Sequence, residues 1–181
     1  MSEILTHTRV MFDPVHPDQE KIRIRDIAHA LSMLCRANGH FPTFYSVGQH
    51  CINCMREAEA RGYSSRVQLA CLLHDASEAY LADVTRPVKK ELPRYLEIEE
   101  PLQNLIWLTF LGQPLTEEEY TQVFAIDDAI LYYEFLTLMD TKLAETAPEL
   151  RSAPSFAFMD FAKCEEAYLH HVSRLIKSIR S

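Results

Sequence analysis

The sequence predicts an all-α protein that forms a single domain over residues 1–181. Apolar residues recur at helical spacing through most of the chain, and convincing strand patterns are absent. The length suits one domain with a real hydrophobic core, and a content of 48% hydrophobic and 24% charged residues is ordinary for a globular protein. Only four glycines occur, and neither common phosphate-binding glycine pattern is present, which argues against phosphate-cradling loops.

The first half of the chain is expected to contain an irregular segment followed by helices. Residues 1–23 are predicted to be irregular because Pro14 and Pro17 interrupt any regular pattern. Ser65 and Gln68 have the spacing of a capping box and are predicted to open a helix. The helices expected here cover residues 26–35, residues 46–61 before Gly62, and a third stretch from Ser65 through Ala76.

The second half is expected to contain three further helices after a loop. Pro87 and Pro93 predict a loop or short turn over residues 84–94. Thr116 and Glu119 again have capping-box spacing. The helices expected here cover residues 94–111 before Gly112, residues 116–144, and residues 159–179. The prediction for the whole chain is a bundle of five to seven helices.

Charge and cysteine content limit the partners and the compartment. A formal net charge of -8 repels the phosphate backbone of DNA or RNA, so a nucleic acid polymer is not expected as a partner. A small anionic substrate would need a local cation. The odd count of five cysteines is typical of reduced thiols, and neither a signal sequence nor a membrane-spanning run is found. We therefore expect a cytoplasmic protein without a membrane partner.

The strongest chemical signal is the adjacent pair His74-Asp75, which is expected on a helix. An imidazole nitrogen and a carboxylate oxygen together suit borderline or hard divalent metals. A histidine on an apolar helix face is more often an ordinary core residue. Here, however, the pair follows an apolar run, and a buried carboxylate is costly unless it is paired or bound to a metal. A bound cation is the simplest compensation.

Other residues can complete a site around this pair. His50 lies midway along the preceding helix and Asp128 near the middle of a later one, and a helical bundle can bring such distant positions together. Glu78 follows at helical spacing, and Asp83 is expected just past the helix end. Carboxylates near a metal can orient the attacking water or donate a proton.

Several segments also resemble a known family. The stretch Leu72-Leu73-His74-Asp75-Ala76-Ser77-Glu78-Ala79-Tyr80-Leu81-Ala82-Asp83-Val84 is similar to the signature of HD-domain phosphohydrolases. Phe44-Tyr45-Ser46-Val47-Gly48-Gln49-His50-Cys51 resembles the segment that holds the family's first metal histidine. Asp26-Ile27-Ala28-His29-Ala30-Leu31-Ser32, together with Arg36, resembles the branch of bacterial 5'-deoxynucleotidases and phage-type dATP triphosphohydrolases. Around Gly39-His40 and Phe41 the sequence is more similar to the triphosphate-cleaving and antibiotic-nucleotide phosphohydrolases than to the monophosphatases. The resemblance extends from about Ile22 to Glu134.

The resemblance implies an HD-domain helical bundle and a set of metal ligands. The implied ligands are His50, His74, Asp75 and Asp128. Asp127 is a rival for the last place, and Asp128 is preferred because Glu134 follows it at the spacing that relatives show. The metal would be one divalent ion, with Mn, Co, Fe, Zn and Mg as alternatives.

Roles for the neighbouring residues follow from the same resemblance. Glu78 and Asp83 match acidic residues that orient water and transfer protons, and they are the expected catalytic residues. Arg36 and Lys89 match substrate-binding residues that contact phosphate or neutralise it. The sequence departs from the family at Ala82, where many relatives have glycine, and at Gly48, where alanine is usual.

The expected function is therefore that of an enzyme, a metal-dependent phosphohydrolase that cleaves phosphate or polyphosphate from (deoxy)nucleotides of the purine or adenine type. The resemblance also implies a homo-oligomer, a dimer or larger. One alternative is a regulatory HD module that binds a nucleotide without hydrolysing it. A two-metal HD site is a further alternative, but it needs extra histidines, and none occurs between Tyr80 and Ile126.

Overall fold

The computed structural model describes residues 3–181, and helices make up most of this range, which confirms the all-α prediction. Within these residues eight α-helices occur, one more than the upper end of the expected range, because two of them span only four residues. The helices are α1 (Ile24–Met33), α2 (Val47–Ala60), α3 (Ser65–Leu72), α4 (Glu78–Leu81), α5 (Arg86–Lys89), α6 (Pro93–Leu111), α7 (Glu117–Met139) and α8 (Phe161–Arg180).

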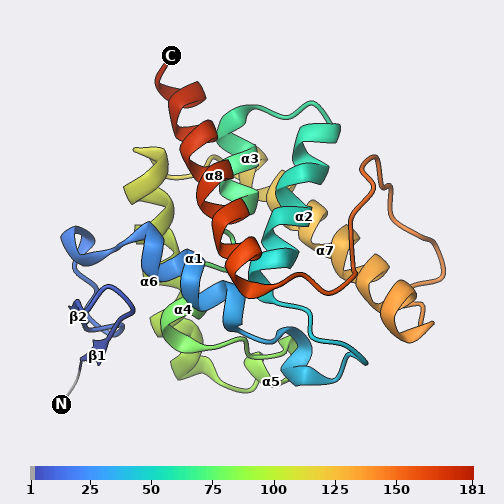
Figure 1. Cartoon of the computed structure of the whole chain (residues 1–181), viewed down its shortest axis with the longest axis horizontal. Coiled ribbons are helices and arrows are strands. Elements are labelled where there is room, and N and C mark those ends of the chain that lie inside the picture. The colour runs from blue at the N-terminus through green and yellow to red at the C-terminus, as the bar shows by residue number, and fades with distance from the viewer. Residues whose placement is uncertain (1–2) are drawn as a thin grey trace.

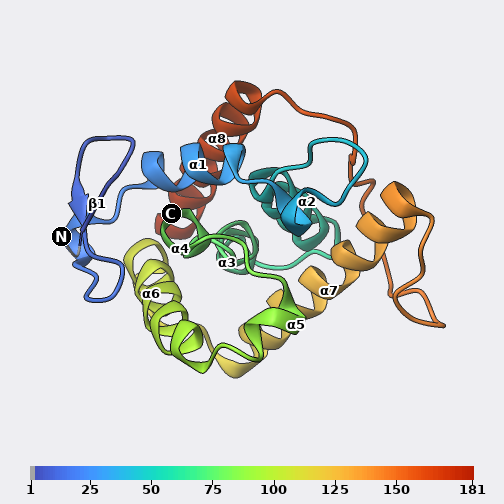
Figure 2. The same ribbon diagram turned by 90° about the horizontal axis from the view of Figure 1, so that it is seen from below.

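Helices α2 and α3 form the centre of the bundle and pack directly against each other. Helices α7 and α8 each contact both of these central helices, and α1 packs against α2 and α8 (Figure 1). From below, α6, α5 and α7 run along one side of the molecule and α1 and α8 along the other (Figure 2). The apolar core lies between these helices, and its largest inaccessible side chains include Leu31, Met55, Leu72 and Ile106.

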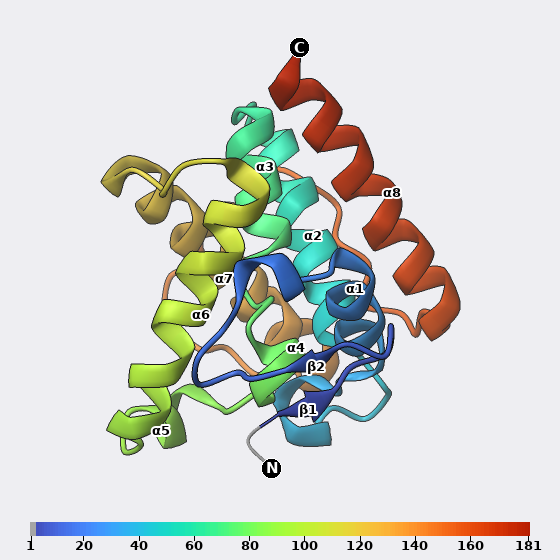
Figure 3. The same ribbon diagram turned by 90° about the vertical axis from the view of Figure 1, so that its left-hand side faces the viewer.

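Residues 3–23 contain short regular elements, which corrects the prediction of an irregular segment for this range; residues 1–2 lie outside the described residues. Strands β1 (Ile4–Leu5) and β2 (Met11–Phe12) form a short antiparallel hairpin that lies in front of α1 and α4 in Figure 3, and a 3₁₀ turn follows at Gln19–Lys21. The backbone N and the Oγ1 of Thr8 donate to the buried carboxylate of Asp26 at 2.6 and 2.9 Å. Phe12 stacks on Tyr80 of α4, with 4.3 Å between the ring centroids. The hairpin is thereby attached to two helices.

Several predicted helix ends need correction. Helix α3 is capped by Ser64, whose hydroxyl accepts from the backbone N of Val67, and not by Ser65. The expected capping box of Thr116 and Glu119 is confirmed at the start of α7. This helix ends at Met139, before the expected position 144, because Asp140 adopts a left-handed conformation with φ of 50°.

The loop predicted over residues 84–94 contains the one-turn helix α5, in which Pro87 occupies the first turn. Proline is tolerated there because the first backbone N–H groups of a helix lack partners within it. Pro93 begins α6 for the same reason. The two prolines therefore start helices here instead of excluding them.

One face of α2 fixes the long connection between α7 and α8. Gln49, Asn53 and Glu57 recur every four residues, are all buried and lie on one face of the helix. The amides of Gln49 and Asn53 donate to the carbonyl of Ser155 at 3.0 and 2.9 Å. The Glu57 carboxylate accepts from the backbone N of Ser152 at 2.8 Å and also from Arg151 and Arg61. Polar side chains of one helix thus hold the connecting segment in place.

Glycine at position 48 permits the close approach of α2 to its neighbours. A β-carbon at Gly48 would lie 3.1 Å from the backbone of Leu31 in α1 and 3.1 Å from Sγ of Cys164 in α8. Glycine at position 48, where the family that the sequence resembles usually has alanine, therefore has a steric reason. Within residues 3–181, no helix combines the length and the apolar character required to cross a membrane.

Candidate metal centre

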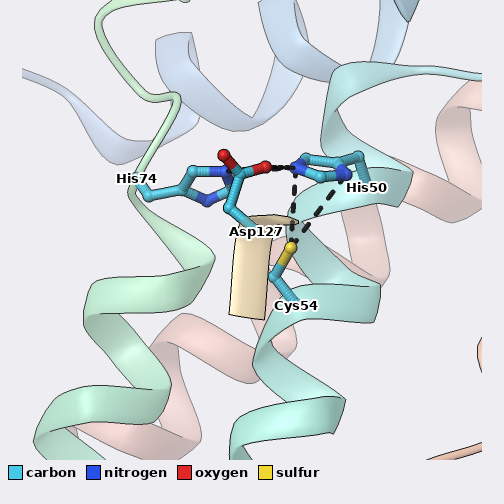
Figure 4. A group of neighbouring side chains, drawn as sticks. All are labelled: His50, Cys54, His74 and Asp127. Carbon is cyan, nitrogen blue, oxygen red and sulfur yellow. Dashed lines mark hydrogen bonds and ion pairs between the residues drawn. The ribbon is translucent and has the colours of Figure 1, made fainter. Parts of the chain in front are cut away.

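Side chains from three separate segments meet in the interior of the bundle. His50 comes from α2, His74 and Asp75 from the turn after α3, and Asp127 from α7. Figure 4 shows the two imidazoles facing Asp127, with Cys54 one turn along α2 from His50. Because α2, α3 and α7 pack against one another, residues far apart in the sequence become neighbours here. His50, Cys54, His74 and Asp127 form one group of donor atoms that could hold a metal ion, and His74 and Asp75 form a second such group with Cys51.

The distances among the donor atoms fit the coordination shell of one divalent ion. Nε2 of His50 lies 3.1 Å from Nε2 of His74 and 3.1 Å from Oδ1 of Asp127. Nε2 of His74 lies 3.3 Å from Oδ2 of Asp75 and 3.6 Å from Oδ1 of Asp127. Metal–ligand bonds of about 2.0–2.2 Å place neighbouring ligand atoms about 2.8–3.6 Å apart in octahedral or tetrahedral geometry. These four separations are therefore close to those of ligands around one ion.

The two histidines also present the correct nitrogen to this point. Nδ1 of His74 lies 2.7 Å from the carbonyl oxygen of Cys71, which can only accept, so Nδ1 carries the proton. Nδ1 of His50 lies 2.6 Å from Oε1 of Glu134 and donates to this carboxylate. Burial opposes a charge on His74, but Asp75 raises the pKa of His74 well above its ordinary value, so its Nε2 readily takes up a proton; when both rings are neutral, the two Nε2 atoms, 3.1 Å apart, carry lone pairs that face each other. A cation between them removes the repulsion, and such carboxylate or carbonyl partners are typical of metal-binding histidines.

Asp127 supplies the second indication that these side chains could bind a cation. Its Oδ1 is buried and forms no properly oriented hydrogen bond with any residue of the described chain, although His50 lies close by. A buried carboxylate oxygen without a partner is costly. Burial alone would raise the pKa of Asp127, but the neighbouring His50 and His74 hold it well below its usual range, so the carboxylate is ionised. Both observations fit a metal ligand.

Asp75 and Cys54 are alternative fourth members of the cluster. Oδ2 of Asp75 lies 3.7 Å from Nε2 of His50, and Sγ of Cys54 lies 3.5 Å from the same atom. Burial holds the pKa of the Cys54 thiol well above its ordinary value, so it is a neutral group packed against His50. Burial also opposes ionisation of Asp75, but His74 beside it lowers the pKa of Asp75. The ionised Asp75 is the better ligand for a hard or borderline ion.

The preference for Asp128 over Asp127 is corrected by these positions. The Asp128 side chain is 62% exposed and pairs with Arg86, outside the cluster of histidines. Asp127 and Glu134 are seven residues apart, which is close to two helical turns, so both side chains lie on the buried face of α7. Asp128 is rotated by about 100° from that face. The spacing to Glu134 therefore favours Asp127 on physical grounds.

The local structure around His74 and Asp75 also differs from the prediction. His74 and Asp75 do not lie on a helix, because α3 ends at Leu72 and residues 73–77 form consecutive turns before α4. Trp107 donates to the carbonyl of Ala70 at 3.2 Å and Gln103 to that of Leu73 at 2.8 Å. Side chains of α6 thus provide hydrogen-bond donors for carbonyl groups at the C-terminal end of α3. The turn directs both side chains of the pair toward His50.

Arg36 lies beside the cluster but is occupied by its carboxylates. Nε of Arg36 donates to Glu134 at 3.0 Å and Nη1 to Asp75 at 3.2 Å, and Nη2 lies 3.6 Å from Asp127. The guanidinium is nearly inaccessible to solvent. Although burial acts against the charge, Glu134 and Asp75 raise the pKa of Arg36 well above its ordinary value. In this structure Arg36 holds the carboxylates of Glu134 and Asp75 in place and offers little free surface to a phosphate.

The remaining predicted residues surround the cluster. Burial and the nearby Asp75 raise the pKa of Glu78 well above its ordinary value, and its Oε2 has no hydrogen-bond partner within residues 3–181. Burial likewise raises the pKa of Asp83, whose Oδ2 accepts from the backbone N of Ala37 at 3.1 Å. Nζ of Lys89 lies 3.9 Å from Glu78 and bonds to Glu99 at 2.6 Å. The structure thus places two carboxyl groups with raised pKa and one lysine near the side chains that could bind a metal ion.

The turn between Glu78 and Asp83 contains a strained residue. Ala82 has a φ of 109°, in the region that favours glycine, which is the residue that many members of the resembling family carry there. Its carbonyl accepts from the hydroxyl of Tyr95 at 2.9 Å. Strained backbone is often retained where it positions functional groups. Here the strained residue directly precedes Asp83, whose carboxylate accepts from the backbone N of Ala37.

The fold and the cluster define an all-α protein with a buried site that could bind a metal ion, and comparisons with known proteins add relatives to this description. No protein-family model matches the sequence. The uncharacterized protein YfdR of Escherichia coli (strain K12) is 38% identical over 95 residues, which cover 52% of this chain and 49% of YfdR. A second uncharacterized protein, from Rhodobacter capsulatus, is 38% identical over 104 residues, which cover 54% of this chain and 53% of that protein. The chain thus spans about half the length of the curated relatives that it matches.

Proposed function

We propose that the protein is a metal-dependent phosphohydrolase of the HD-domain type that acts on nucleotides. The observation that carries the proposal is the convergence of two imidazole Nε2 atoms with the carboxylates of Asp75 and Asp127 at ligand-like separations. Beside them lie the two carboxyl groups with raised pKa, Glu78 and Asp83. A metal cluster flanked by an acid–base pair favours metal-assisted hydrolysis over a purely structural metal site.

The chain would hold the ion through His50, His74, Asp75 and Asp127. When bound, a divalent ion in such a site polarises a phosphoryl oxygen and promotes ionisation of water. Glu134 and the carbonyl of Cys71 keep the proton on Nδ1 of each histidine, so that both Nε2 atoms remain free to bind. Mn, Co, Fe, Zn and Mg are all compatible with two nitrogen and two oxygen ligands.

Glu78 and Asp83 are proposed as the groups that move protons. A carboxyl group transfers protons most effectively when its pKa lies near the working pH, and burial shifts Glu78 in that direction. Its unpaired Oε2 is available to accept a proton from the attacking water. Asp83 would supply a proton to the leaving oxygen, and the backbone N of Ala37 keeps its carboxyl group in place.

The substrate is proposed to be a small phosphorylated molecule, a (deoxy)nucleotide of the purine or adenine type. A chain with a net charge of -8 needs local positive charge to accept phosphates, and Lys89 and Arg86 lie on α5 beside the cluster. The five cysteines are free thiols in the structure, which supports the proposed cytoplasmic location. A homo-oligomeric state, a dimer or larger, belongs to the same proposal.

A substrate and metal screen tests this function. The purified chain is stripped with a chelator, reloaded separately with Mn, Co, Mg, Fe or Zn, and incubated with mono-, di- and triphosphate nucleotides. The proposal expects metal-dependent release of phosphate, pyrophosphate or triphosphate, and the product identifies the bond that is cleaved. Asp75→Ala should abolish both metal binding and product release.

Two outcomes would count against the proposal. Full activity of the metal-stripped Asp75→Ala variant would show that the cluster does not perform the chemistry. Nucleotide-induced thermal stabilisation without any released product would instead favour the regulatory module that binds a nucleotide without hydrolysing it.

A further inference from the structure

We infer that Arg86 is the phosphate-binding arginine of this site, and that Asp128 is the counter-ion that holds its guanidinium until an anionic substrate takes its place. The inference rests on the proposed function and assigns to its substrate site two residues that the sequence pattern does not assign to phosphate. Arg86 lies at the start of α5. One guanidinium nitrogen of Arg86 donates to Asp127 and the other to Asp128.

Exposure shows from which side a ligand reaches the cluster. The side chains of His50 and Glu134 are inaccessible to solvent, and they lie at the closed end of the site. Exposure rises to 18% at Asp75, 51% at Arg86 and 62% at Asp128. A substrate that reaches the metal position therefore approaches from the side where Arg86 stands.

The position of Arg86 relative to the cluster suits a phosphate that contacts the ion. Asp127 binds Arg86 through Oδ2, while its Oδ1 faces Nε2 of His50 and His74. The guanidinium is thus separated from the metal position by a single carboxylate. A phosphate that contacts the ion through one oxygen would have other oxygens directed toward this open side. The planar guanidinium can bind two oxygens of one phosphate, a geometry that a lysine does not offer.

The other cations beside the cluster are less available. Arg36 is buried among three carboxylates, and turning it toward a ligand would leave buried negative charge without a partner. Lys89 is mostly buried and bonds to Glu99 at 2.6 Å. The side chains of Arg86 and Asp128 are both exposed, and exposed ion pairs contribute little to stability. Among the described cations around the cluster, Arg86 is therefore the one that can exchange its partner at least cost.

Asp128 gives the exchange a preference for strongly charged ligands. A phosphate group with two negative charges can displace a single carboxylate from the guanidinium, whereas a singly charged or neutral ligand competes poorly. Removal of the Asp128 charge should therefore strengthen phosphate binding, although Asp128 itself would not touch the phosphate. This sign distinguishes the inference from a structural role, in which the loss of either partner would only weaken the site.

The experiment measures inorganic phosphate binding to the full, metal-saturated chain by calorimetry, after the metal affinity of each variant has been measured separately. Arg86→Gln should weaken phosphate binding at least about tenfold while the site still takes up metal. Arg86→Lys should fall between this variant and the wild type, because it keeps the charge and loses the two-pronged geometry. Asp128→Asn should strengthen phosphate binding about threefold to fivefold. Arg94→Gln removes an exposed arginine of α6 and should change nothing.

The possible results separate this inference from the proposed function. Wild-type phosphate affinity in metal-saturated Arg86→Gln would overturn the inference and leave the metal site intact. Weakened metal binding in Arg86→Gln, with unchanged phosphate affinity at saturating metal, would show that Arg86 only orients Asp127, and the inference would be wrong. If the wild-type chain binds no metal, the proposed function fails first and the inference fails with it.

Discussion

The adjacent residues Asp127 and Asp128 provide a matched test of the metal centre. Both are changed to asparagine, which keeps the size of the side chain and removes the charge. The structure places Asp127 among the donor atoms of the cluster, 3.1 Å from Nε2 of His50, and leaves Asp128 62% exposed beside Arg86. The expectation is that Asp127→Asn abolishes tight metal binding and that Asp128→Asn preserves it.

The environments of the two carboxylates determine the size of the expected effects. Removal of one member of a buried charge cluster costs about 3–5 kcal/mol. At about 1.4 kcal/mol per tenfold change, this corresponds to a loss of metal affinity of about 10²–10³-fold or more for Asp127→Asn. An exposed ion pair contributes about 0–1 kcal/mol, so Asp128→Asn should change metal affinity by less than about fivefold.

Metal affinity is measured by competition with a coloured chelator, and circular dichroism confirms that both variants fold. The temperature of unfolding with and without Zn or Mn provides a second reading, because a metal that binds only the folded chain stabilises it. Equal metal affinity in both variants would refute the reasoning from geometry. A loss of affinity in Asp128→Asn alone would restore the ligand that the sequence pattern preferred.

Further predictions concern stability. Glu78→Gln should raise the unfolding free energy at pH 8 by about 1 kcal/mol, because the raised pKa of Glu78 makes its ionisation costly in the folded chain. Below about pH 4.5 Glu78 is protonated in both the folded and the unfolded wild type, so the stability difference between variant and wild type should vanish there. Urea unfolding measured as a function of pH tests this. Ala82→Gly should stabilise the chain by about 1 kcal/mol in the same assay, since glycine relieves the positive φ at a smaller entropic cost, and a lower stability would contradict the strain. Glu57→Ala should destabilise the chain by about 2–4 kcal/mol at pH 7, because it removes the acceptor of several hydrogen bonds. Although burial opposes ionisation of Glu57, its hydrogen bonds to Ser152 lower its pKa, so this contribution is present above about pH 4.5 and should be lost as the pH falls below that value; a constant difference between the variants down to pH 3 would oppose this assignment.

Helical periodicity was sufficient to predict the fold class and most of the helices. The capping box of Thr116 and Glu119 was predicted correctly because it depends on two residues only three positions apart in the sequence. The end of α7 was not, because apolar residues continue past Met139 while the chain leaves the helix at a left-handed Asp140. Helix ends of this kind depend on tertiary contacts that a sequence pattern does not contain.

For the candidate metal centre, the sequence indicated His50, His74 and Asp75, and the structure brings these three side chains together. The resemblance favours Asp128 through its spacing to Glu134, whereas the structure places Asp127 beside the histidines and leaves Asp128 exposed. A separation of seven residues from Glu134 would have selected Asp127, since it places both side chains on one face.

Two features of the site had no accessible sequence signal. The turn over residues 73–77 interrupts an apolar pattern that predicts a continuous helix, and the carbonyls of Ala70 and Leu73 there accept hydrogen bonds from Trp107 and Gln103 of α6, about thirty residues away. The contact of Arg86 with Asp127 joins α5, a one-turn helix that contains a proline, to the long helix α7. Contacts of this range follow from the packed bundle and not from local preferences.

The attachment of the N-terminal hairpin has a practical consequence for anyone who shortens the chain. A boundary drawn at the first long helix, α1, would remove Thr8 and Phe12. The buried carboxylate of Asp26 would then lose both hydrogen bonds from Thr8. Tyr80, which lies on α4 two residues after Glu78, would lose the stacking contact with Phe12. A shortened version could therefore be expressed as a helical protein and still have a disturbed site. Fusion tags and crystallisation variants are better designed to keep residues 3–12.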